Sequence, residues 1–284
     1  MSENIGISRR NKKLSKEGPT SICIFSRNRP LQLHALLKSL KTYVYPLRDV
    51  TVLYRYDEKY QPALNEVKEQ FQGYKFIEDD NFKQQVCLFL ESAGPTCFFL
   101  VDDIIFRRPV DNNFCTAILD HNPDMLTFSL RMGLHLTYCY PVNQSQAIPD
   151  GYIQNQLFLW SWRNAQCDWN YPFSVDGHIF RSKQLLSYTR HLDFHHPNSF
   201  EAEMQKIQFT FAVPSACVCH TESCLFNNPL NRVQNDFENR SGNITTEDLL
   251  AKWDEGLEID IKKLAKLIPN AAHTIAELPL KERT

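Results

Sequence analysis

The chain alternates between short apolar runs and longer stretches in which apolar residues recur every three or four positions. Apolar runs of five to seven residues with polar flanks are typical of buried strands. After Pro30, which suits the first turn of a helix, Leu33, Leu36, Leu37 and Leu40 fall on one helical face. The pattern predicts strands at 21–25, 50–56, 74–78, 97–101 and 125–130.

Helical segments separate these predicted strands. Residues 58–72 show a helical pattern, Asn81 is a candidate N-cap for the next helix, and Asp111 is a candidate N-cap for a helix that ends near Asp120. Strands that alternate with helices favour right-handed crossovers and a mainly parallel sheet with helices on both sides. The sequence therefore predicts an α/β fold of the Rossmann-like kind.

The regular alternation stops at residues 132–172, which are rich in Tyr, Trp, Asn, Gln and Pro. We interpret them as an irregular insertion over the sheet, in which Trp160, Trp162 and Trp169 are either core residues or a stacking surface for a ligand. Beyond it the pattern predicts a strand at 178–182, a helix from Lys183, a helix from Asn198 to Gln208, a strand at 215–220 and a final helix from Thr245 or Thr246.

Composition excludes several classes of protein. A net charge of −2 gives no electrostatic reason to expect nucleic acid or an anionic membrane as a partner. No apolar run approaches the roughly 20 residues that cross a bilayer. Nine cysteines without a framework spacing favour reduced thiols, so we expect a cytoplasmic protein.

Two adjacent carboxylates, Asp102 and Asp103, end the apolar run in "CFFLVDDIIF". Ligands bind at the carboxyl ends of the strands in parallel α/β sheets, which is where this pair is predicted to lie. Like charges need a positive partner or water, and a hard cation such as Mn²⁺ or Mg²⁺ would neutralise them. The alternative is that Asp102 caps a turn and Asp103 is solvated.

Three segments together resemble glycosyltransferases of the GT-A fold, and are similar to the family 2 enzymes. They are "SRNRPLQLHALLKSL", "FFLVDDIIF" at the place of the Asp-x-Asp motif, and "YPFSVDGHIFR" before the catalytic helix. The resemblance implies that Asp103 holds the metal and that Asp102 faces the ribose or a metal-bound water. Val101 departs from the strict motif, since it stands where the first carboxylate belongs.

The same resemblance implies a nucleotide-binding side. The turn after the first strand would contact the nucleotide, Asp57 would face the base or ribose, and a polar loop near residue 232 would act as a lid. The candidate residues for donor binding are Ser26, Arg27, Arg29, Asp57, Asp80 (with its neighbour Asp79), Lys83, Asp102 and Arg232.

An inverting transfer needs a carboxylate that accepts the proton of the acceptor hydroxyl. By resemblance Glu201 is the first candidate, Glu203 the second and Asp176 a rival. Glu201 also stands at capping-box spacing from Asn198, so it has a structural alternative. A late histidine, His220, is a candidate third metal ligand, although a lone histidine is more often structural.

The resulting hypothesis is a metal-assisted, inverting glycosyltransferase that uses a UDP-, GDP- or dTDP-type sugar donor and a glycan or glycolipid acceptor. The alternatives are a sugar-phosphate nucleotidyltransferase, disfavoured because "SRNRP" lacks glycine, and a non-catalytic partner module. The expected domains are a disordered basic tail at 1–19, a catalytic domain at 20–243, divided at 131/132 into nucleotide and acceptor halves, and a helical extension at 244–284.

Overall fold

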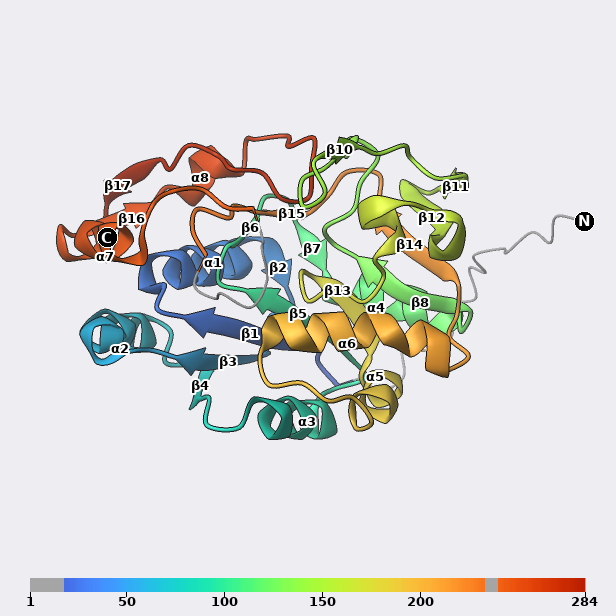
Figure 1. The fold of residues 1–284 in the computed structure, drawn as a ribbon, viewed down its shortest axis with the longest axis horizontal. Helices are drawn as coiled ribbons and strands as arrows, with labels where there is room; N and C mark the ends of the chain where they lie inside the picture. Colours follow the sequence, from blue (N-terminus) through green and yellow to red (C-terminus); the bar gives the residue numbers. More distant parts are fainter. Residues whose placement is uncertain (1–17, 233–239, 284) are drawn as a thin grey trace, which may run out of the picture.

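A nine-stranded sheet forms the centre of the molecule in the computed structural model, which describes residues 18–232 and 240–283 (Figure 1). Most of the predicted basic tail lies outside the described residues. The strands of the sheet, in spatial order, are β11 (Gly151–Gln154), β12 (Leu157–Ser161), β14 (Ala216–His220), β8 (Met125–Ser129), β13 (His178–Arg181), β5 (Thr96–Val101), β1 (Ser21–Arg27), β3 (Asp49–Arg55) and β4 (Lys75–Glu78).

All seven strands predicted from the apolar runs are present in this sheet. β1 pairs in parallel with β3 and β5, β3 with β4, and β8 with β14. β13 runs antiparallel between β5 and β8, so these two strands point the same way and their carboxyl ends share one edge of the sheet. The predicted α/β fold with a mainly parallel sheet is confirmed.

Helices cover both faces of the sheet because the side chains of the central strands are apolar on both sides. The α-helices are α1 (Pro30–Tyr43), α2 (Gln61–Gln70), α3 (Phe82–Ser92), α4 (Asn112–His121), α5 (Ser182–Thr189), α6 (Pro197–Thr210), α7 (Thr246–Asp254) and α8 (Ile261–Leu264). Ile22 and Ile24 of β1 pack into a core with α1, α2, α4, α7 and α8, whereas Cys23 and Phe25 pack into a second core with α3, α5 and α6.

Short elements fill the connections. Asn81 and Asp111 cap α3 and α4 through their side chains, as the sequence predicts. The short strands are β2 (Val44–Tyr45), β6 (Ile104–Phe106), β7 (Val110–Asp111), β9 (Tyr138–Cys139), β10 (Gln144–Ser145), β15 (Leu225–Asn227), β16 (Leu257–Ile259) and β17 (Leu280–Glu282), and the 3₁₀ turns are η1 (Glu58–Tyr60), η2 (Trp162–Asn164) and η3 (Cys167–Asn170).

The insertion at 132–172 is more regular than predicted. It adds β11 and β12 to the sheet, where β12 pairs antiparallel with β14. Trp160, Trp162 and Trp169 are buried, with at most 4% of each residue exposed, so they are core residues and not a stacking surface. β12 is apolar and buried at four consecutive positions, which is the same pattern as in the strands that were predicted.

The N-terminus of α6 also differs from the prediction. His196, not Asn198, is the N-cap, and it forms a capping box with Ser199. Glu201 therefore has no part in capping the helix, which removes the structural alternative considered for this carboxylate. Its carboxylate instead accepts hydrogen bonds from Ser174 and Val175.

The C-terminal segment packs on α1 and then crosses the molecule before it returns to β17 (Figure 1). Glu258 of β16 is fully buried and pairs with Lys38 of α1 and Lys281 of β17. Between α8 and β17, backbone hydrogen bonds tie Ala272 and Thr274 to Asn227. The segment thus reaches the edge of the sheet where the predicted site residues lie.

Two findings bear on the setting of the protein. Within residues 18–232 and 240–283, none of the helices combines the length and apolar character needed to cross a lipid bilayer. All nine cysteines are described and none is in a disulfide. A cytoplasmic location stays a prediction.

Candidate active site

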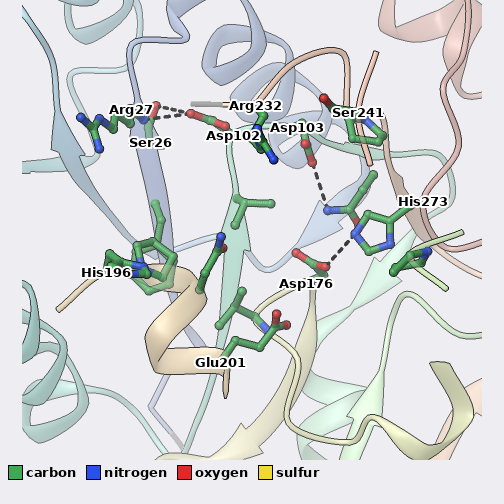
Figure 2. A pocket seen from close by; sticks show the side chains of 18 of the residues that line it. Ser26, Arg27, Asp102, Asp103, Asp176, His196, Glu201, Arg232, Ser241 and His273 are labelled. Atoms are coloured by element: carbon green, nitrogen blue, oxygen red, sulfur yellow. Dashed lines mark hydrogen bonds and ion pairs between the residues drawn. The ribbon is translucent and has the colours of Figure 1, made fainter. Parts of the chain in front are cut away.

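A cleft of about 590 Å³ opens at the carboxyl ends of β1, β5 and β8, bounded on one side by the first turn of α6 (Figure 2). It brings together residues predicted for both sides of the reaction, although they lie far apart in the sequence. The predicted residues that line it are Ser26, Arg27, Arg29, Asp102, Asp103, Asp176, Glu201 and Arg232.

The turn between β1 and α1 is fixed by an asparagine. Asn28 has a φ of 54°, in the left-handed region that asparagine tolerates better than most residues. Its side-chain amide donates to the Asp57 carboxylate at 2.7 Å and accepts the Asp57 backbone N–H at 2.8 Å. Asp57 therefore anchors this turn from the end of β3. It was predicted to face the base or ribose, but it does not line the cleft.

Asp102 is fully engaged by protein groups. Its Oδ1 lies 2.8 Å from Arg29 Nη1, and its Oδ2 accepts the Ser26 hydroxyl and the Arg27 backbone N–H, both at 3.0 Å. Only 3% of the residue is exposed. The positive partner that the buried pair requires is thus an arginine, and the prediction that Asp102 binds the metal or faces the ribose stays a prediction.

Asp103 has a different environment, although it is the next residue. Its Oδ1 accepts the Asn227 amide at 3.0 Å, and its Oδ2 lies 3.9 Å from Arg29 Nη1. Burial, partly offset by Arg29 and reinforced by Asp102, raises the pKa of Asp103 to about 6. Asp103 is therefore the member of the pair with an oxygen available to a ligand.

The raised pKa of Asp103 has a testable effect on stability. The folded protein holds this proton more tightly than the unfolded chain, so stability falls as the pH rises from about 4 through about 6. We expect Asp103→Asn to unfold at a higher temperature than the wild type at about pH 7.5, and this gain to vanish near pH 4. Thermal unfolding measured across pH checks this. The exposed Asp80→Asn serves as the control, and an equal gain there at pH 7.5 would contradict it.

Glu201 projects from the first turns of α6 into the cleft. Its Oε1 accepts the Ser174 hydroxyl at 2.8 Å and the Val175 backbone N–H at 3.0 Å. Burial and the nearby Asp176 charge raise the pKa of Glu201, against the opposing effects of the Val175 N–H, Arg131 and Ser174. A carboxylate with a raised pKa, fixed in a cleft, has the properties of a general base.

Asp176 is a weaker candidate for the base. It lies in the turn before β13, 3.4 Å from Arg131 and 3.4 Å from His273 Nε2. Although burial opposes it, the His273 hydrogen bond and the Arg131 charge lower the pKa of Asp176 to about 2. A group with so low a proton affinity accepts a proton poorly, so the structure favours Glu201.

Five predicted residues do not line the cleft. Asp57 anchors a turn, the exposed Asp80 accepts from Gln85, and its neighbour Asp79 lines the cleft instead. The other three are Lys83, Glu203 and His220.

Lys83 lies 5.9 Å from the centre of the Phe194 ring, and Glu203 pairs with Lys206 on the outside of α6. His220 packs against Phe128, with ring centres 5.2 Å apart, and it does not line the cleft. The predicted metal ligand His220 therefore lies outside the cleft lining, and His273 is a histidine that lines the cleft.

A metal site needs a donor set, and the described part of the chain has no group of three or more His, Cys, Asp or Glu side chains arranged to hold an ion. Asn227 Oδ1 is buried without a hydrogen-bond partner, and the same amide group donates to Asp103. A hard cation prefers oxygen ligands. The oxygens of Asp103 and Asn227 would suit such an ion, and the metal role of Asp102 and Asp103 stays a prediction.

Sequence reasoning missed Arg131, Asp168, Asn227 and His273, all of which line the cleft. Arg131 follows β8 and could have been found by the rule that places ligands at the carboxyl ends of parallel strands. His273 gives no such signal, because it lies between α8 and β17 in a segment without periodic pattern.

No family model matches the chain. Several solved structures resemble it at 12–13% identity. They are Staphylococcus aureus TarS 1–349 in complex with UDP (TM-score 0.45, 72% of this chain and 59% of that one), mannosyltransferase PcManGT from Pyrobaculum calidifontis with GDP-Man and Mn²⁺ (0.37, 74% and 61%), and a CMP:2-keto-3-deoxy-manno-octonic acid synthetase with CTP (0.44, 84% and 99%).

The sequence itself matches a curated protein, the bifunctional glycosyltransferase pgtA of Dictyostelium discoideum. The two are 26% identical over 258 residues, which cover 79% of this chain and 33% of the relative. The chain thus spans about one third of that protein's length. The resemblance drawn from the motifs is confirmed: this chain is a sequence relative of a glycosyltransferase.

Proposed function

We propose that this chain is a glycosyltransferase that moves a sugar from a nucleotide-diphospho-sugar to a hydroxyl of a glycan or glycolipid. The observation that carries the proposal is the convergence of Asp103 from β5, the turn after β1 and Glu201 from α6 on one cleft. The sequence relative supports the same class of reaction. UDP, GDP and dTDP are the candidate nucleotides.

The donor would occupy the end of the cleft formed by β1, β3 and β5. Arg27 and Arg55 are exposed there, and guanidinium groups suit phosphate oxygens and base faces. Arg29 lies deeper and neutralises the carboxylate pair. A Mn²⁺ or Mg²⁺ ion bound at Asp103 would supply further neutralisation of the diphosphate.

The acceptor would lie beside Glu201, in the half of the cleft formed by α6 and the 171–176 loop. The acceptor oxygen attacks the anomeric carbon, the bond to the diphosphate breaks, and the acceptor proton passes to Glu201. One carboxylate serving as base, opposite the leaving group, corresponds to inversion at the anomeric carbon. Tyr140 and Tyr171 also line the cleft.

One observation favours a second candidate, a non-catalytic module. Asp102 is hydrogen-bonded within the protein by Arg29, Ser26 and a backbone N–H, so these protein groups already neutralise and hold one carboxylate of the pair. A module of this kind would bind a nucleotide, or none, without turning it over.

A donor panel separates these functions. We expect the purified chain with Mn²⁺ to hydrolyse at least one of UDP-, GDP- and dTDP-glucose, and Asp103→Ala to lose that hydrolysis. Asp80→Ala is the matched control, since Asp80 is exposed and does not line the cleft. Nucleotide binding without hydrolysis, or no binding with or without metal, would favour the module.

A further inference from the structure

Arg131 is a buried cation at the acceptor end of the cleft. It lies two residues after the end of β8, and 2% of the residue is exposed. Its Nη2 lies 2.7 Å from Asp168 Oδ1, and its Nη1 lies 2.8 Å from Ser174 Oγ and 3.4 Å from Asp176 Oδ2. One side chain therefore contacts three polar groups of the 168–176 segment.

Burying a guanidinium is costly unless acceptors surround it. Asp168 and Asp176 provide the compensating charges, and both carboxylates are themselves buried. The rigid planar fork of arginine can contact several acceptors in fixed directions, which the single ammonium of lysine cannot. The arrangement holds the segment that carries Ser174 and Asp176 in one position against β8.

The hydrogen bonds of Ser174 connect this fixed segment to Glu201. A hydroxyl has one hydrogen to donate and two lone pairs that accept. Ser174 Oγ accepts from Arg131 at 2.8 Å and from the Asp176 backbone N–H at 3.1 Å, so both lone pairs are used. Its only hydrogen is left for Glu201 Oε1 at 2.8 Å.

We infer that Arg131 is a positioning residue, which acts through Ser174 to fix the Glu201 carboxylate. The inference rests on the proposed function, because it assigns Glu201 the role of base. It extends that function to a residue that need not touch the substrate.

The other titratable groups that face Glu201 define the expected pH effect. Tyr171 and Asp176 lie on the loop before β13, and His195 and His196 line the cleft at the start of α6. Asp176 raises the pKa of Glu201, and Arg131 is a positive group that lowers it. Loss of Arg131 therefore raises the proton affinity of the base further.

The test compares Arg131→Met, Arg131→Lys and Ser174→Ala in hydrolysis of the donor that the wild type uses, followed against pH. For Arg131→Met we expect kcat to fall by about 10²-fold, the acid limb to move up by about one pH unit, and the donor KM to stay unchanged. Arg131→Lys should restore the acid limb but not kcat. Ser174→Ala should lower kcat and move the limb less than Arg131→Met.

Arg181→Met is the matched control, because Arg181 is a half-buried arginine on β13 that donates to backbone carbonyls away from the cleft. It should lower stability without moving the pH profile. A wild-type profile in both Arg131 variants, or losses that match Arg181→Met per folded molecule, would overturn the inference. If Arg131→Met does not fold, Arg131→Lys and Ser174→Ala decide. A wild type that hydrolyses no donor refutes the proposed function instead.

Discussion

Replacing Glu201 with glutamine is expected to lower kcat by about 10²–10⁴-fold while donor affinity stays close to that of the wild type. Glutamine keeps an oxygen that can accept from Ser174 and the Val175 N–H, so the side chain stays in place but cannot take a proton. Turnover with a saturating donor, together with calorimetric titration of the nucleotide, measures the two quantities separately.

Glu203→Gln is the matched control for this experiment. It makes the same chemical change two residues away on α6, where the side chain pairs with Lys206 outside the cleft. Its kcat should stay within about twofold of the wild type, as expected for a surface substitution. Comparable losses in both variants, or a fully active Glu201→Gln, would remove Glu201 from the reaction.

The wild-type pH profile offers a second view of the same group. Burial and the Asp176 charge raise the pKa of Glu201, and only the ionised carboxylate accepts a proton. The pKa of an ordinary glutamate is about 4.3. The acid limb of kcat should therefore lie at a higher pH than this value.

Replacing Arg29 with methionine is expected to lower the free energy of unfolding by about 3–5 kcal/mol. The substitution leaves the Asp102 carboxylate without its cationic partner, in a site where 3% of the residue is exposed. Urea denaturation measures the loss. Arg29→Met combined with Asp102→Asn should recover part of it, because the unpaired charge is then removed.

Arg27→Met provides the comparison for this second result. Arg27 is two residues away and its side chain is exposed, so its replacement should change stability by less than about 0.5 kcal/mol. If Arg29→Met is as stable as Arg27→Met, the ion pair with Asp102 does not hold the site together.

Periodicity accounts for what the sequence could predict. Strands of the β1 and β5 kind are buried on both faces, so they stand out as apolar runs, and α1 stands out through its leucines at helical spacing. The rule that ligands gather at the carboxyl ends of such strands then placed Asp103 in the right region. These inferences need only local pattern and topology.

Contacts between residues far apart in the sequence account for what the sequence could not predict. Arg29 is 73 residues from Asp102, and nothing in the local sequence says that an arginine, and not a cation from solution, neutralises that carboxylate. His220 was a reasonable choice at the end of β14, but its ring packs against Phe128 instead. Side-chain direction, not position along the chain, decided both cases.

The path of the C-terminal segment has a practical meaning for anyone who shortens this chain. His273 lines the cleft, and Ala272 accepts the Asn227 backbone N–H at the end of β15. Glu258 fastens the same segment to Lys38 of α1 and also pairs with Lys281. An expression boundary drawn after α7 would keep every strand of the central sheet. It would nevertheless remove His273 and so leave the cleft open on that side.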